Sequence, residues 1–189
     1  MTNRPHSHCP LVKKILALLV PSDDAQMYER AVGALEEMWG KPERISGRTP
    51  FTWTKYYDDI SPKLDRIFFS WPGLFPVSEL PDWKIATCRI EVSTGDAEAR
   101  RRINLDPGSI DGARLLLAST KDNAQRIYLR DGIFCEITLC RRKGHWEKFF
   151  YTFPDFASGI YDKWLETVRE DWKRDTRRAA AVARGAKNA

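Results

Sequence analysis

The spacing of hydrophobic residues divides the first 40 residues into a strand and a helix. The run VKKILALLV, from residue 12 up to Pro21, is almost continuously apolar, which is typical of a central strand buried on both faces. In residues 23–40, DDAQMYERAVGALEEMWG, apolar residues recur every three or four positions. This spacing predicts a helix that begins after an N-cap at Ser22 or Asp23, ends at Gly40 and covers one face of a sheet.

Alternation of apolar and polar residues predicts strands through most of the middle of the chain. Three prolines and a glycine in residues 72–81 predict an ordered loop, and the Asp106-Pro107-Gly108-Ser109 sequence predicts a turn. Asp131-Gly132 suits a type I′ turn, so residues 126–142 should form a hairpin, and residues 146–153 should add an edge strand. The other expected strands are FTWTKYY (51–57), DRIFFSW (65–71), KIATCRIEVST (84–94), RRINL (101–105) and LLLAS (115–119).

Residues 157–178 return to helical spacing, with an apolar stripe that includes Tyr161, Leu165 and Val168. The predicted fold class is therefore α+β: a single domain with a mostly antiparallel or mixed β-sheet, an N-terminal β-α unit and a C-terminal amphipathic helix. We expect a flexible arm at residues 1–11, the domain at residues 12–172, and a basic, mobile tail at residues 173–189.

Charge and cysteine content restrict the partners and the compartment. The chain has 31 basic and 26 acidic side chains. Residues 173–189 hold six of the basic ones and one of the acidic ones, so the rest of the chain has 25 of each. A neutral body makes nucleic acid a weaker expectation than a small ligand. No apolar run reaches the roughly 18 to 20 residues that cross a bilayer, and no signal peptide is evident, so we expect a cytoplasmic protein without membrane contact. The four cysteines form no C-x-x-C pair and should be free thiols.

Familiar catalytic motifs are missing from the sequence. It contains no phosphate-binding loop, no G-x-G-x-x-G, no G-x-S-x-G and no H-E-x-x-H. His6, His8 and Cys9 lie together in the expected arm, where three donors on a flexible end are a poor metal site. This leaves His145, in the probable turn RRKGHWE, as the single plausible histidine for acid-base chemistry.

The polar side chains in the segment 101–139 suggest a binding site on one face of the sheet. Strand alternation groups Asn104 with Asp106, Arg126 with Tyr128, and Glu136 with Thr138, while Lys121 and Asp122 follow the strand 115–119. Converging carboxylate, amide, lysine and arginine groups could hold a phosphate or carboxylate, and Arg126→Ala should then abolish binding without unfolding the chain. Glu91 with Asp106 or Glu136 could hold Mg²⁺, and Asp106 or Glu136 could act as a base. The alternative is an ordinary solvated sheet face.

Several sequence blocks on the same residues resemble a known family. NLDPG, LASTKD, RIYL, GIFCEITL and YTFPDF, with YYDD upstream, resemble in order the signature blocks of a bacterial family catalogued as domain of unknown function 4416. The resemblance covers about residues 12 to 170 and implies no activity. Gln125 stands where the family pattern has His, so imidazole chemistry is not implied. The positions that match the family motifs are Asn104, Asp106, Pro107, Gly108, Lys121, Asp122, Arg126, Tyr128, Glu136, Pro154 and Asp155.

The leading hypothesis is a protein that binds a small anionic ligand, a nucleotide or another phosphate ester, with Mg²⁺ as a possible companion, on this charged face. Its ligand-binding candidates are Glu91, Asn104, Asp106, Lys121, Asp122, Arg126, Tyr128, Glu136 and Asp155. One alternative is an RNA- or ribosome-associated module that uses the basic tail. Another is a scaffold without a ligand, in which Trp53, Trp71 and Trp83 form a partner surface.

Overall fold

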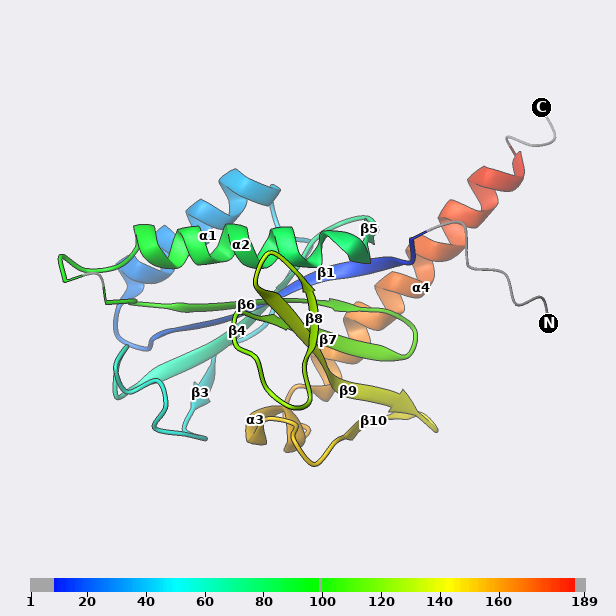
Figure 1. Cartoon of the computed structure of the whole chain (residues 1–189). Coiled ribbons are helices and arrows are strands. Elements are labelled where there is room, and N and C mark those ends of the chain that lie inside the picture. The colour runs from blue at the N-terminus through cyan, green and yellow to red at the C-terminus, as the bar shows by residue number, and fades with distance from the viewer. Residues whose placement is uncertain (1–8, 99, 186–189) are drawn as a thin grey trace.

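The computed structural model describes residues 9–98 and 100–185 as one antiparallel sheet with helices on both faces (Figure 1). Within these residues the ten strands run in the order β10-β9-β7-β6-β1-β4-β2, with β3 beside β4, β5 beside β1 and β8 beside β9. The strands are β1 (Leu11–Pro21), β2 (Arg44–Ile45), β3 (Thr49–Phe51), β4 (Leu64–Ser70), β5 (Phe75–Pro76), β6 (Asn104–Ile110), β7 (Arg114–Ser119), β8 (Ile127–Arg130), β9 (Ile133–Arg142) and β10 (His145–Lys148). The helices are α1 (Ala25–Trp39), the 3-10 turn η1 (Val77–Glu79), α2 (Leu80–Ser93), α3 (Pro154–Ala157) and α4 (Asp162–Gly185). The α+β prediction is confirmed.

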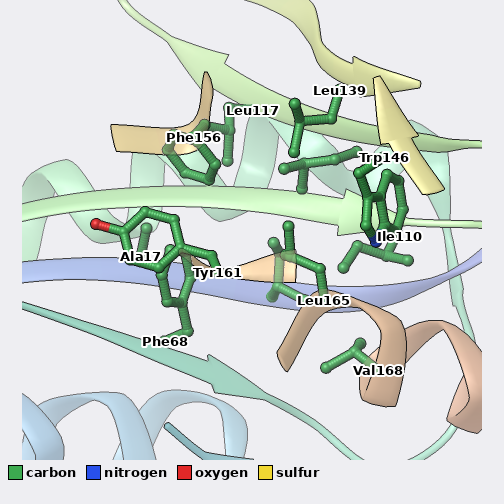
Figure 2. Close-up of a cluster of buried hydrophobic side chains, with 12 residues drawn as sticks. Ala17, Phe68, Ile110, Leu117, Leu139, Trp146, Phe156, Tyr161, Leu165 and Val168 are labelled. Atoms are coloured by element: carbon green, nitrogen blue, oxygen red, sulfur yellow. The ribbon is translucent and has the colours of Figure 1, made fainter. Parts of the chain in front are cut away.

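Strand β1 lies at the centre of the sheet and is buried on both faces, as its apolar run predicts. Leu16 and Leu18 belong to a cluster with α1 and α2 on one face. Ile15 and Ala17 belong to the opposite cluster, in which Leu165 of α4 packs on the sheet (Figure 2). Because β1 pairs with β4 on one side and with β6 on the other, it joins the two halves of the sheet.

Two buried lysines interrupt this apolar strand. The Lys13 ammonium donates to Glu43 Oε2 at 2.6 Å and to Asp175 Oδ2 at 2.8 Å, and so ties β1 to α4. The Lys14 ammonium has no such carboxylate contact within the described residues, and burial lowers its pKa to about 8. It lies 4.2 to 4.7 Å from the centres of three aromatic rings, those of Trp39, Phe75 and Trp83.

Helix α1 confirms the predicted helix, with a different cap. The carboxylate of Asp24, rather than Ser22 or Asp23, accepts from the Met27 amide at 2.8 Å. Gly40 ends the helix at φ 77°, a conformation that glycine adopts without strain.

Helix α2 corrects the largest error of the sequence prediction, which placed a strand at residues 84–94. The residues alternate in polarity, but Leu80, Trp83, Thr87 and Ile90 also recur at helical spacing, and all four are among the side chains that α2 buries. Pro81 lies in the first turn, where a missing amide costs nothing. The expected loop at residues 72–81 therefore contains β5, η1 and the start of α2.

The predicted turn at residues 106–109 is also wrong, because these residues lie inside β6. Gly108 serves a close approach of two strands: a Cβ atom there would lie 2.2 Å from the carbonyl oxygen of Leu116 and 2.7 Å from Leu117 Cδ2. The chain turns later, where the Asp111 amide donates to the Arg114 carbonyl oxygen.

The remaining sequence predictions are confirmed in part. Asp131 and Gly132 both have positive φ values, 54° and 75°, as a type I′ hairpin requires. The edge strand is β10, which is shorter than the expected 146–153, and the strand expected at residues 51–57 is reduced to β3. Strands β4 and β7 match the prediction.

Helix α4 packs on the sheet through Leu165 and Val168, with Tyr161 just before the helix in the same cluster, and its last turns project beyond the sheet (Figure 1). The basic segment from residue 173 continues the helix as far as Gly185, with residues 177–185 exposed. The mobility of this segment stays a prediction, and so does the N-terminal arm, most of which lies outside the described residues. Within the described part of the chain, none of the helices is long and apolar enough to cross a membrane.

Candidate functional site

The sheet opens between β6 and β7, and this opening positions the candidate site. Strand β6 pairs with β1 over seven residues, Asn104 to Ile110, but with β7 over only three, Gly108 to Ile110. From Gly108 back toward Asn104 the two strands separate, so the first half of β6 has no strand partner on that side within the described chain. The backbone groups freed there must be satisfied in another way.

Side chains of α2 take the place of the missing strand. The Leu105 amide donates to Glu91 Oε1 at 2.5 Å, and the Lys84 ammonium donates to the Leu105 carbonyl oxygen at 2.7 Å. The same ammonium contacts Asp106 Oδ1 at 3.2 Å. Burial opposes the charged form of Lys84, but the carboxylates of Asp106 and Glu91 outweigh it and raise the Lys84 pKa. Burial also raises the pKa of Glu91, against the opposing charge of Lys84.

The opening leads into a pocket of about 570 Å³, a volume that suits a small-molecule ligand. Seven of the nine ligand-binding candidates line it, which supports the prediction that polar groups of separate strands converge; binding by them stays a prediction. These seven are Glu91, Asn104, Asp106, Lys121, Arg126, Glu136 and Asp155.

Two of the nine candidates and the candidate histidine lie elsewhere. Asp122 is not among the residues that line the pocket. Tyr128 is exposed on β8 and contacts Phe134. His145 is exposed on the edge strand β10, 3.6 Å from Glu147. The geometry therefore gives no support to imidazole chemistry in the pocket.

The sequence prediction missed Arg66, the most unusual cation of the pocket. Its side chain, on β4, is 5% exposed and lies 3.4 Å from Asp155 Oδ2 and 4.0 Å from Asp106 Oδ2. Its guanidinium also lies 4.9 Å from the centre of the Phe51 ring. Among the residues that the structure describes, Arg66 Nε and Nη1 have no hydrogen-bond partner although both atoms are buried. Unpaired buried donors cost stability, and a bound acceptor would satisfy them.

Arg126 has a structural role that the sequence did not reveal. Its side chain donates to Glu136 Oε2 at 2.9 Å, to Ser119 Oγ at 2.7 Å and to the Lys121 carbonyl oxygen at 3.0 Å. These bonds hold the loop after β7 against β9. Arg126→Ala would thus leave the buried Glu136 carboxylate without its cation, and the expectation that this substitution spares the fold has to be withdrawn.

Each of the three carboxylates considered for Mg²⁺ accepts a hydrogen bond from a neighbouring group. Glu91 accepts from Leu105, and Asp106 accepts from Lys84 and, at 2.6 Å, from Asn104 Nδ2. Glu136 accepts from Arg126. In residues 9–98 and 100–185, no group of three or more His, Cys, Asp or Glu side chains could hold a metal ion. The residues present do not fit a preformed Mg²⁺ site.

Aromatic side chains form the outer part of the pocket. Trp53 is 39% exposed, Tyr56 is 53% exposed and Phe153 is 41% exposed, although all three line it. The Lys121 ammonium lies 4.3 Å from the centre of the Tyr56 ring, so the loops before β4 and after β7 meet at this point. Trp71 and Trp83 are buried, at 1% and 3% exposed, which removes them from the partner surface expected for a scaffold.

Comparison with known proteins identifies a family and no further relative. A family model described as domain of unknown function (DUF4416) matches residues 10–172, which include every residue that lines the pocket. No curated protein and no solved structure matches this chain. The interpretation of the pocket therefore depends on its own geometry.

Proposed function

This chain belongs to the DUF4416 family, and we propose that its pocket binds a small anionic ligand, a nucleotide or another phosphate ester. The observation that carries the proposal is Arg66, a residue of the pocket lining with two buried donors that have no hydrogen-bond partner among the described residues. Guanidinium groups bind phosphate and carboxylate through paired N–H donors, which is the contact that Arg66 lacks.

The charge of the pocket lining agrees with an anionic ligand. Within the described chain the lining holds five basic side chains and four acidic ones. Three of the acidic ones accept from a basic neighbour at 3.4 Å or less: Asp106 from Lys84, Asp155 from Arg66, and Glu136 from Arg126. Lys121 contacts Tyr56 without a carboxylate partner among the residues described, which leaves it able to contact an anion.

The proposal does not depend on a metal ion of the protein's own. Because Asp106, Glu91 and Glu136 are engaged by other residues, Mg²⁺ would have to arrive with the ligand's phosphates. We therefore expect similar affinity in excess EDTA and in millimolar Mg²⁺ for a monophosphate.

The test is thermal unfolding of the full chain with inorganic phosphate, sugar phosphates, nucleotides and short RNAs. A ligand at 100 times its Kd adds about 2.7 kcal/mol of stability, which for this size raises the Tm by roughly 5 to 11 °C. Arg66→Lys keeps the charge and removes the guanidinium fork, so it should weaken binding at least about tenfold, or 1.4 kcal/mol.

Arg48→Lys is the matched control for this substitution. Arg48 also pairs with an aspartate, Asp65 at 3.4 Å, and lies over an aromatic ring, that of Tyr28 at 4.5 Å, but it is not among the residues that line the pocket. Arg48→Lys should bind like the wild type. Equal loss in both variants, or no Tm shift with any anion, would contradict the proposal. A shift only with RNA would favour the nucleic-acid alternative.

A further inference from the structure

A second group without a hydrogen-bond partner among the described residues belongs to the pocket lining. The Glu136 side chain, on β9, is 2% exposed, and its Oε2 accepts from Arg126 at 2.9 Å and from Gln125 Nε2 at 3.2 Å. Its Oε1 is buried and, in the part of the chain that the structure describes, has no hydrogen-bond partner. A carboxylate oxygen can only accept, so it requires a donor, most simply an N–H group.

The strand register places Arg66 and Glu136 on the same face of the sheet. Arg66 pairs with Leu19, which pairs with Asn104 on β6. Glu136 pairs with Leu117, which pairs with Gly108 on β6. Asn104 and Gly108 are four residues apart on one strand, so both point to the same face.

The two unpaired groups belong to side chains on different strands, which favours a ligand with two ends. Arg66 on β4 and Glu136 on β9 are four strand positions apart in the sheet, and the Arg66 guanidinium reaches toward β6, to 4.0 Å from Asp106 Oδ2. A molecule with an anion at one end and an N–H donor at the other could satisfy both.

The aromatic residues between the pocket and solvent favour a ligand that carries a planar ring. Exposed Trp53, Tyr56 and Phe153 offer ring faces on which a nucleobase can stack. Of the planar groups that stack in this way, nucleobases combine an exocyclic N–H donor with a linked phosphate. A carboxylate distinguishes bases well, because it accepts from an amino group and repels a keto oxygen.

We propose that the pocket selects nucleotides whose base carries an exocyclic amine, with the phosphate at Arg66 and the amine at Glu136 Oε1. This inference rests on the proposed function and assigns Glu136 as its specificity-determining residue. The chain then binds AMP in preference to IMP and CMP in preference to UMP, because each second member presents a keto oxygen where the first presents an amine.

The experiment is calorimetric titration of the full chain with AMP, IMP, CMP and UMP. In the wild type we expect the amino member of each pair to bind at least about tenfold tighter than the keto member. In Glu136→Gln the preference should disappear or invert, because a carboxamide can also donate to a keto oxygen. The ratio is taken within one variant, so a uniform loss of stability or affinity cancels.

Glu37→Gln is the control for the loss of a carboxylate, because Glu37 is exposed on α1 and is not among the residues that line the pocket. It should keep the wild-type ratio. Equal affinity within each pair, or an amino preference that persists in folded Glu136→Gln, would overturn the inference. If sugar phosphates bind and depend on Arg66 while the pairs are equal, only this inference fails. If no phosphate ester binds at all, the proposed function fails as well.

Discussion

Replacing Gly108 by alanine tests the close approach of β6 and β7, on which the opening of the sheet depends. The added methyl group would lie 2.2 Å from the backbone oxygen of Leu116 and 2.7 Å from the Leu117 side chain. The side chain can rotate away, but the carbonyl is fixed by the strand, so β6 and β7 must separate where they share only three paired residues. Overpacking of this kind costs about 1 to 3 kcal/mol, and contact with backbone places Gly108→Ala near the upper end.

Gly33→Ala is the control, since Gly33 lies in α1, and apart from its chain neighbours and the backbone of the same helix no atom lies within 4 Å of the added methyl group. There the substitution should stabilise the chain by about 0.5 to 1 kcal/mol. Urea unfolding followed by tryptophan fluorescence gives both free energies, and thermal unfolding should show a loss of roughly 6 to 12 °C for Gly108→Ala. If Gly108→Ala unfolds at the wild-type urea concentration, the two strands are not in this contact and the predicted turn at residues 106–109 regains support.

Two further substitutions test buried charges. Arg126→Ala should lower the free energy of unfolding by about 3 to 5 kcal/mol, because it leaves Glu136 buried without its cation. Arg130 is exposed, so Arg130→Ala should lower it by less than about 1 kcal/mol. Equal urea midpoints for the two variants would contradict this prediction. For Lys14, whose pKa burial lowers to about 8, the unfolded state keeps its proton to higher pH than the folded state does, so stability that is fully present above the ordinary lysine pKa of about 10.4 is lost as the pH falls through 8. Relative to Lys14→Met, the wild type should therefore gain roughly 1 to 3 kcal/mol between pH 7 and pH 10, and a constant difference in urea unfolding would refute the reasoning.

The fold could be predicted where local pattern and tertiary environment agree. The apolar run of β1 and the Asp131-Gly132 turn each admit one reasonable structure. Helix α2 has polarity that suits both a strand and a helix, and the choice is made by contacts that the sequence does not display. Its Lys84 and Glu91 side chains bind the backbone of Leu105, and this contact depends on where β7 leaves β6.

The site could be predicted only in part for the same reason. Strand alternation was enough to bring Asn104 and Asp106 together with Glu136, because these residues lie on adjoining parts of one sheet face. Arg66 was missed because it follows Asp65 near the start of β4, and the local sequence indicates no partner for it on another strand. The pairing of β4 with β1 positions Arg66 at the pocket, and nothing in the sequence near residue 66 indicates the register of that pairing.

The central position of β1 has a consequence for synthesis of the chain. Strand β1 precedes β4 and β6 in the chain, so during synthesis it must wait for residues 64–70 and 104–110 before it can pair. At about 5 to 20 residues per second, β4 follows roughly 2 to 9 s later, and until then an apolar strand with unpaired backbone is free to associate with other nascent chains. Lys13 and Lys14 place two positive charges in the middle of that segment, and like charges oppose its association with copies of itself. The finished protein has to accommodate both charges in its interior, one between two carboxylates and one among aromatic rings. The two lysines thus reduce self-association of β1 before β4 and β6 have been synthesised.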